Sequence, residues 1–455
     1  MSENSLRSGL SLLRVPRIRR IVTSYVFSSF GSAVGSVAIA FLAYHESDSV
    51  VLTALVLAGN TLPFLVLAPV TTRLFSRFDV RFLLVASMIG KALIWTAAAV
   101  LSGVGALHYG LILGGAFLYG SLSTLSEPTW PRLMESIAPP GRLTELNALT
   151  KSAPAPAWIV GAVVGGILVA SAGPGWALAI DAASYLPCAL VIVSMPRVPP
   201  SGPKGPRTVR GGAQVVLASP RLRHAFLLAG ALNLAAFPVL STLPAVAAEI
   251  EPTGHPLGYL HAAFYLGTAL VAFTIAWLRQ HLPYSRLLAF GFFIAGIVLM
   301  LFAGLTAWRD PGVDAVAVAA VTLLPVGLAL TMNAAILQSL VQLETKEHEK
   351  GSVIVLYATV IGVLTPLGGI AIGFFADAFS LWWSLAASGL ILAALAVILA
   401  PQLEVFDELD SERGAGAVQR STRAHWGIHL RHTLMGDVAG ADQTATAATE
   451  GGATT

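Results

Sequence analysis

Long apolar runs alternate with short polar segments over most of this chain of 455 residues. A helix needs about 20 apolar residues to cross the hydrocarbon core of a bilayer, because lipid offers no hydrogen-bond partner to bare backbone groups. Runs that lack Asp, Glu, Lys and Arg except near their ends reach this length at residues 21–43, 50–71, 82–103, 107–127, 153–172, 176–195, 224–246, 257–278, 286–307, 313–334, 352–376 and 380–400. The pattern predicts an all-α integral membrane protein with twelve transmembrane helices.

The longest internal polar gap, residues 197–223, is rich in Pro, Gly and Arg and divides the predicted spans six and six. We expect a cytoplasmic linker there, between an N-terminal six-helix bundle at 21–196 and a C-terminal one at 224–400. A basic segment follows both the second and the eighth span, and glycines cluster in both the fifth and the eleventh. Transporters built from two pseudo-symmetric bundles show such weak repeats.

The distribution of basic residues predicts the orientation. With the N-terminus inside, only Arg309 of the 27 Lys and Arg residues falls in an outer loop, and only Lys91 falls deep in a span. Cytoplasmic loops retain positive charge, so we expect a plasma (inner) membrane protein with both termini cytoplasmic. Residues 1–20 are then a basic cytoplasmic segment, and the polar residues 401–455 a disordered cytoplasmic tail. Because five arginines precede the first span and eleven similar spans follow it, we expect that span to be retained.

Composition and motifs exclude several classes of protein. Hydrophobic residues make up 55% of the chain and charged residues 11%, whereas soluble domains carry about a quarter charged residues. The single cysteine, Cys188, excludes an intramolecular disulfide. The sequence lacks an ATP-binding P-loop, a Gly-x-Ser-x-Gly elbow and a His-Glu-x-x-His motif. We therefore expect no enzyme activity, no cofactor, no metal site and no ATP-driven pump.

Several short segments occur in order at matching helices: Leu62-Pro63, Asn147-Ala148, Ile180-Asp181-Ala182, Leu217 to Arg223 and Leu257 to Gly267. With these, residues 10–400 resemble the major facilitator superfamily, in particular the branch that contains macrolide and siderophore exporters. The resemblance implies the major facilitator fold of two pseudo-symmetric six-helix bundles. It also implies export of a small molecule by alternating access, with the substrate between the bundles.

Two positions depart from what that branch usually shows. Ser32 follows the first helix's glycine, and Ser76 lies in the loop after the second helix, where the exporters usually keep acids. The antiporter-associated Gly-Pro-x-x-Gly-Gly of the fifth helix reads Gly161-Ala-Val-Val-Gly165-Gly166. If protons drive transport here, other groups must carry them, and Lys91, Asp181, Glu127 and His261 are the candidates.

Lys91 is the most unusual residue, because it lies about 15 Å above the cytoplasmic start of the third span at 1.5 Å per residue. It is a candidate for binding an anionic substrate group or for titrating during transport, or it simply faces carbonyls in a wet crevice. The superfamily's third helix usually flanks the cavity. Asp181 is a candidate partner of Lys91 or proton acceptor, with a polar contact near the interface as the alternative.

The remaining candidates are a possible gate and a set of neutral polar groups. Glu127, at the inner end of the fourth span, is a candidate to close a cytoplasmic gate by pairing with Arg77 or Arg81, and is otherwise a solvated helix end. His261 is a coupling candidate or an interfacial histidine. In the superfamily, helices one, four, seven and ten line the cavity. Asn233, Asn333 and Gln338 are therefore better candidates for substrate contacts than Asn60. The alternative for all four is a hydrogen bond between helices.

The sequence therefore predicts a secondary active transporter that exports a lipophilic or amphipathic small molecule, such as a drug, an antibiotic or a siderophore-like compound. The expected partners are that substrate, protons as the coupling ion and the lipid bilayer, without nucleic acid and with the chain as a monomer. The alternative is a transport-inactive facilitator-like receptor or scaffold. This alternative is suggested by the two serines at usually acidic positions and by the long tail.

Overall fold

The computed structural model describes residues 11–200, 209–251, 254–278, 281–307, 314–346 and 348–403. The N-terminal half comprises η1 (Leu12–Arg14), α2 (Pro16–Ser47), α3 (Val50–Gly59), α4 (Leu62–Val66), α5 (Ala68–Arg77), α6 (Val80–Gly103), α7 (Tyr109–Ser126), α8 (Trp130–Ile137), α9 (Leu143–Ser152), α10 (Ala155–Ser171) and α11 (Pro174–Val193). The helix α12 (Val209–Ala218) comes next. The C-terminal half comprises α13 (Pro220–Ala235), α14 (Val239–Ile250), α15 (His255–Leu278), α16 (Tyr284–Ala307), α17 (Ala315–Glu344), α18 (Lys350–Ala378) and α19 (Leu381–Leu403).

These helices confirm the predicted all-α membrane fold. Among the described residues, ten helical stretches are long and apolar enough to cross a membrane. The other two predicted spans are also helical: the second is divided into α3, α4 and α5, and the fourth is the 18-residue α7. Several helices extend past the predicted runs, as α17 does to Glu344, because polar residues continue a helix beyond its apolar stretch.

Proline explains the interrupted spans. Pro63 and Pro69 lie in the first turns of α4 and α5, where the backbone N–H that proline lacks would have no partner within the helix. Neither proline can donate the hydrogen bond that would continue the preceding helix. In the C-terminal half, Pro238 lies between α13 and α14, which together form the seventh predicted span. Within the predicted linker, residues 209–218 form α12, which packs on α18. The predicted disordered tail lies outside the described residues from position 404 onward.

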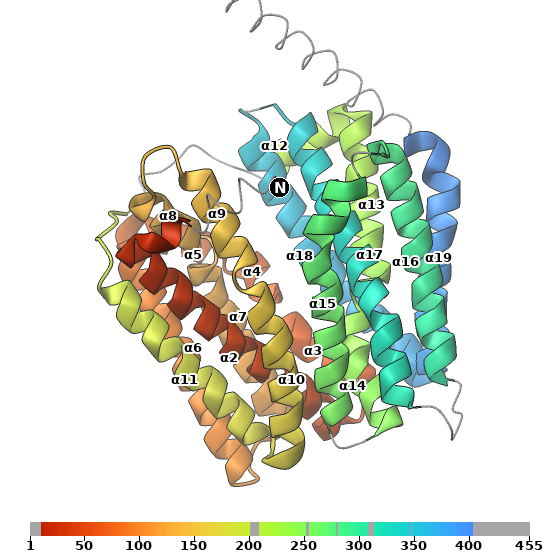
Figure 1. The fold of residues 1–455 in the computed structure, drawn as a ribbon, viewed down its shortest axis with the longest axis horizontal. Coiled ribbons are helices and arrows are strands. Elements are labelled where there is room, and N and C mark those ends of the chain that lie inside the picture. Colours follow the sequence, from red (N-terminus) through yellow and green to blue (C-terminus); the bar gives the residue numbers. More distant parts are fainter. Residues whose placement is uncertain are drawn as a thin grey trace, which may run out of the picture.

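The helices form two groups that lie side by side (Figure 1). The red-to-yellow helices of the N-terminal half occupy one side of the view, and the green-to-blue helices of the C-terminal half the other. The groups diverge toward the end that carries α8, α9 and α12, which we call the basic end because the Arg-rich loops lie there. They converge toward the opposite end, where α10, α14 and α15 meet (Figure 1).

Packing between the halves is concentrated toward the end opposite the basic one. There α10 packs on α15 and α3 on α18. A methyl group on Gly166 of α10 would lie 2.7 Å from the Cα of Gly258 in α15, so the backbones cross at a distance that only glycine permits. Asp377 of α18 accepts hydrogen bonds from the backbone N–H groups of Val50, at 2.8 Å, and Val51, at 3.2 Å. An acid of one half thus caps a helix of the other.

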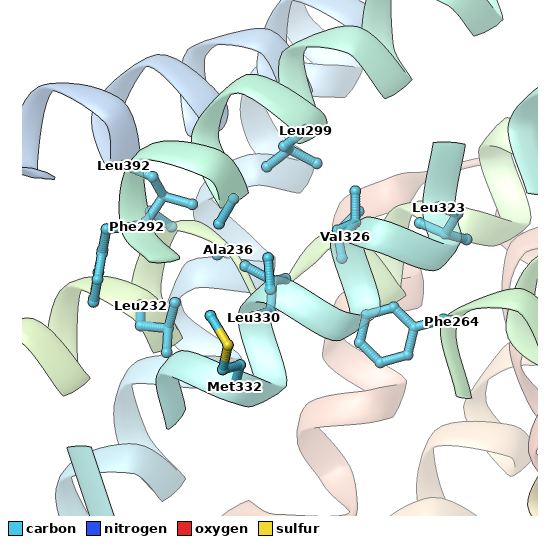
Figure 2. Close-up of a cluster of buried hydrophobic side chains, with 14 of the residues drawn as sticks. Leu232, Ala236, Phe264, Phe292, Leu299, Leu323, Val326, Leu330, Met332 and Leu392 are labelled. Carbon is cyan, nitrogen blue, oxygen red and sulfur yellow. The ribbon is translucent and has the colours of Figure 1, made fainter. Parts of the chain in front are cut away.

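Each half has its own apolar core. In the C-terminal half, buried side chains of α13, α15, α16, α17 and α19 interlock, and Figure 2 shows Leu232, Phe264, Phe292, Leu330 and Leu392 among them. In the N-terminal half, α2 and α11 pack closely, and α6 packs on α11. The C-terminal cluster also includes Val37, Val50 and Ala162 of the N-terminal half, so apolar packing continues across the contact between the halves.

Candidate functional site

A cavity of about 270 Å³ lies in the N-terminal half, among α2, α6, α7 and α11. Its lining combines hydroxyl groups, aromatic rings and charged side chains: Tyr25, Ser28, Ser29, Ser32, Gly35, Ser36, Ile39, Leu57, Asn60, Met88, Lys91, Trp95, Tyr119, Ser126, Glu127, Trp130, Trp158, Asp181 and Tyr185. Three of the predicted site residues, Lys91, Asp181 and Glu127, therefore meet at one cavity.

Lys91 is in the middle of α6 and is 4% exposed. Its ammonium group donates a hydrogen bond to the Ser126 hydroxyl of α7 over 3.1 Å. The same Nζ lies 4.7 Å from the ring centroid of Tyr119, within the range of a cation–π interaction. Lys91 forms no ion pair with any described carboxylate. The third span thus contributes a buried cation to the cavity, although in the family this helix was expected to flank it.

Asp181 is the other buried charged residue of the cavity, at 3% exposed in α11. Its Oδ1 accepts a hydrogen bond from the Ser32 hydroxyl of α2 over 3.3 Å. The aspartate therefore lies next to Ser32, at whose position the related exporters usually keep an acid, and both residues line the cavity. The predicted direct pairing of Asp181 with Lys91 is not formed in this structure.

Three hydroxyl groups join the two charged residues. The Tyr119 and Tyr185 hydroxyls are 3.2 Å apart, and the Tyr185 hydroxyl is 2.8 Å from that of Ser32. A hydroxyl carries one proton, so if Ser32 donates to the carboxylate, it must accept from Tyr185, which in turn accepts from Tyr119. An ionised Asp181 therefore orients the whole chain toward itself. Lys91 lies over the ring of Tyr119 at the chain's other end.

Small residues of α2 make room for this carboxylate. A methyl group on Gly35 would overlap Asp181 Oδ2, and one on Gly31 would overlap the Ser184 hydroxyl. The glycines and serines of the first span therefore let α11 approach α2 closely enough for Asp181 to reach Ser32. The small residues of the first span thus make the close contact between α2 and α11 possible.

Aromatic side chains form much of the remaining wall. Trp95 packs against Tyr119 with ring centroids 5.2 Å apart, and Trp130 packs against Tyr25 at 4.9 Å. Trp158 of α10 contacts Tyr265 of α15 at 5.2 Å, which connects the cavity wall to the C-terminal half. The buried Nε1 of Trp95 and Oδ1 of Asn60 have no hydrogen-bond partner in the structure. Each adds an unused polar atom to an otherwise apolar wall.

The gate candidates lie at the basic end but do not pair in this structure. Arg81 donates from Nη1 to the carbonyls of Val193, at 3.0 Å, and Met195, at 3.2 Å, and so closes the C-terminal end of α11. Arg77 and Glu127 are exposed. No ion pair joins Glu127 to either arginine among the described residues. The gate stays a prediction. Its ion pairs would form in a conformation in which the basic end is closed.

The other candidates lie away from this cavity. His261 is buried in α15, and its Nδ1 lies 3.0 Å from the Leu257 carbonyl. Asn233 of α13 accepts a hydrogen bond from Thr365 of α18 over 2.9 Å and so joins two helices. Buried Asn333 faces Gly291 of α16, and Gln338 is exposed. Their predicted contacts with substrate are not tested by this geometry.

Sequence reasoning missed the role of two tyrosines. Tyr119 and Tyr185 supply two of the three hydroxyl groups of the chain, yet a tyrosine in an apolar span does not stand out by its residue type. A signal was available in their positions: Tyr185 follows Asp181 by four residues and so lies on the same helix face. The fourth span carries Tyr119 seven residues before Ser126, which also places both on one face.

The fold and the lined cavity between packed helices are those of a multi-pass membrane transporter. Residues 7–420 match the transmembrane secretion effector family, a family of the major facilitator superfamily. The chain belongs to this family.

Curated relatives match a shorter part of the chain. The Enterobactin exporter EntS of Escherichia coli O1:K1 / APEC is 29% identical over 155 residues, which are 33% of this chain and 36% of the relative. The protein of the same name from Shigella boydii serotype 18 is 31% identical over 145 residues, 31% of this chain and 33% of the relative. The matched region thus spans about a third of the length of these relatives.

Solved structures with little sequence identity share the fold. A bacterial homologue of the human lysosomal transporter Spinster superposes with a TM-score of 0.68 at 14% identity, covering 86% of this chain and 97% of that one. A bacterial homologue of the iron transporter ferroportin gives 0.66 at 12% identity, covering 85% and 99%. The nucleoside transporter NupG gives 0.61 at 14% identity, covering 86% and 98%. At such identities the comparison defines the architecture alone.

Proposed function

We propose that this protein is a proton-coupled secondary transporter that exports a lipophilic or amphipathic small molecule across the plasma membrane. The hydroxyl chain that ends at Asp181 carries this proposal, because it gives a buried carboxyl a hydrogen-bonded route to the cavity. Partial similarity to proteins named as Enterobactin exporters supports the direction of transport.

The arrangement of the two halves supports alternating access. The halves meet at the end opposite the basic one, through α10 with α15 and α3 with α18. Positive charge is retained on the cytoplasmic side of membrane proteins, so the basic end is cytoplasmic and the structure is closed toward the outside. Rocking of the halves would open the outer end and close the basic end, where Glu127 with Arg77 or Arg81 is available to form the gate.

Asp181 is the proposed site of proton coupling. A carboxyl buried in the membrane is costly to keep ionised unless it is hydrogen-bonded, so its protonation state and its bond to Ser32 are linked. When Asp181 is protonated it no longer needs a donor, and the Ser32 and Tyr185 hydroxyls can turn toward the cavity. Proton uptake from the outside and release to the cytoplasm would then alternate with substrate binding and release.

Efflux in everted membrane vesicles tests the proposal. Vesicles that contain the protein would be energised to form a pH gradient and given a panel of amphipathic compounds that includes enterobactin. We expect at least one compound to accumulate above vesicles without the protein, and the accumulation to vanish when nigericin collapses the pH gradient in potassium buffer. Accumulation that persists after the collapse would exclude proton coupling, and no accumulation of any compound would exclude the exporter.

A further inference from the structure

Lys91 is the buried cation of the cavity, and no described carboxylate lies close enough to form an ion pair with it. At 4% exposed it is shielded from water, and removing an ammonium ion from water costs several kcal/mol unless a partner compensates. Buried lysines in folded proteins are accordingly almost always paired. No described carboxylate forms an ion pair with Lys91.

The partners that Lys91 does have are neutral. An ammonium group has three N–H donors, and the Ser126 hydroxyl, at 3.1 Å, accepts one of them. The face of the Tyr119 ring, at 4.7 Å, adds an electrostatic attraction without accepting a conventional hydrogen bond. Donor capacity therefore remains at the point where the side chain enters the cavity lining.

The two acids of the cavity are occupied in other ways. Asp181 accepts from Ser32 and is packed against α2 at Gly35, so its carboxylate is stabilised within the α2–α11 contact. Glu127 lines the cavity from an exposed position and forms no ion pair with Lys91. A cationic ligand would therefore have to displace existing contacts of Asp181 and would also be repelled by Lys91. An anionic ligand would supply the group that Lys91 lacks.

We infer that the cavity binds a small molecule whose anionic oxygen, a carboxylate, sulfonate or phenolate, accepts hydrogen bonds from Lys91 Nζ. The remainder of the molecule is apolar or aromatic, because Met88, Trp95 and Trp130 line the same cavity. This inference names the substrate class of the proposed transporter and therefore rests on that function.

Binding of matched acid and amide pairs tests the inference directly. The full-length protein in neutral phosphatidylcholine nanodiscs would be titrated calorimetrically with 2-naphthoate and 2-naphthamide, and with 4-phenylbenzoate and 4-phenylbenzamide. A charge-assisted hydrogen bond strengthens binding by about ten-fold or more. We expect each acid to bind at least about ten-fold more tightly than its amide to the wild-type protein.

Three variants identify the residue responsible. In Lys91→Met we expect acid affinity to fall to that of the amide, with amide affinity unchanged, which also shows that the variant is folded. Lys91→Arg should retain the preference for the acid. The control Lys151→Met changes an exposed lysine of α9 that is not in the cavity lining, and should bind all four compounds as the wild type does.

The inference is overturned if neither acid binds the wild-type protein, if acid and amide bind equally, or if Lys91→Met keeps the preference. Its failure is separable from failure of the proposed function, because the vesicle experiment measures accumulation without reference to Lys91. A preference for acids that depends on Lys91, together with no transport in vesicles, would leave the anion site in place and remove the transporter. Transport in vesicles without that preference would support the transporter and remove the anion site.

Discussion

Asp181 brings a buried carboxyl to Ser32, a position where the sequence itself has no acid. The exporters that the sequence resembles usually keep an acid at the position of Ser32, and here the carboxyl comes from α11 and meets the Ser32 hydroxyl across the helix contact. Gly35 leaves the space that makes this meeting possible. This arrangement supports the proposal that Asp181 takes the place of the acid that is absent at Ser32.

Replacing the carboxyl tests its role. Asp181→Asn keeps the size and one acceptor of the side chain but removes its ionisation, so it should still bond with Ser32. We expect pH-driven accumulation in everted vesicles to fall at least about ten-fold while exchange down a concentration gradient continues. The matched control is Asp314→Asn, since Asp314 is an exposed cap at the start of α17 and asparagine caps as well. Full pH-driven accumulation by Asp181→Asn would refute the coupling role.

Gly35 provides a test of the local packing. Gly35→Ala places a methyl group on Asp181 Oδ2, and overpacking of this kind costs about 1–3 kcal/mol. We expect a clear fall in the thermal unfolding midpoint of the purified protein and weaker pH-driven transport. In Gly362→Ala the added methyl meets nothing within 4 Å, so this helical control should be as stable as the wild type or slightly more stable. Equal midpoints for both variants would contradict the described α2–α11 contact.

At the scale of helices, the contact between α3 and α18 links the two halves. Asp377 accepts from the N–H groups of Val50 and Val51 and from the Ser49 hydroxyl, which lies 2.5 Å from its Oδ2. These three donors are at the start of α3, where backbone N–H groups have no partner within the helix. An acid from the opposite half satisfies them, so the cap exists only while the halves are closed at this end.

Asp377→Ala should therefore favour the conformation that is open at this end. A helix cap contributes about 1 kcal/mol, which corresponds to roughly a five-fold change in the ratio of the two conformations. Ala54 of α3 is buried against Gly369 of α18 and reports on the opening. In a Cys188→Ala, Ala54→Cys chain we expect faster labelling by a membrane-impermeant maleimide once Asp377 is replaced. Glu46→Ala, which removes an exposed acid at the same end, is the control. Unchanged labelling by Asp377→Ala would show that the cap does not hold the halves together.

The sequence predicted the helices better than it predicted the site. Charge-free runs located the spans because the bilayer demands them, and Pro63 and Pro238 account for where two of them are interrupted. Lys91 and Asp181 stood out because charge in an apolar span is costly. Tyr119 and Tyr185 did not, since a hydroxyl chain depends on how helices are rotated against one another, which one sequence does not contain.

For the whole molecule, the two groups of helices and the asymmetric cavity support the proposed alternating access. The buried charges of the cavity belong to the N-terminal half, whereas the C-terminal half contributes an extensive apolar core. We infer that the N-terminal half binds the substrate and the proton, and that the C-terminal half closes over them. Contacts at one end of the halves must then break as contacts at the other end form.

The distance between the basic ends of the halves tests this claim most directly. Spin labels would be placed at Glu135→Cys in α8 and Lys346→Cys after α17, both exposed, in a Cys188→Ala chain reconstituted in proteoliposomes. The control pair, His108→Cys and Phe379→Cys, reports on the opposite end. Pulsed electron resonance would be recorded over a series of pH values. We predict two populations whose proportions change with pH, the basic ends approaching as the opposite ends separate, with the pH response lost in Asp181→Asn. A single distance at each end, unchanged by pH, would contradict the account.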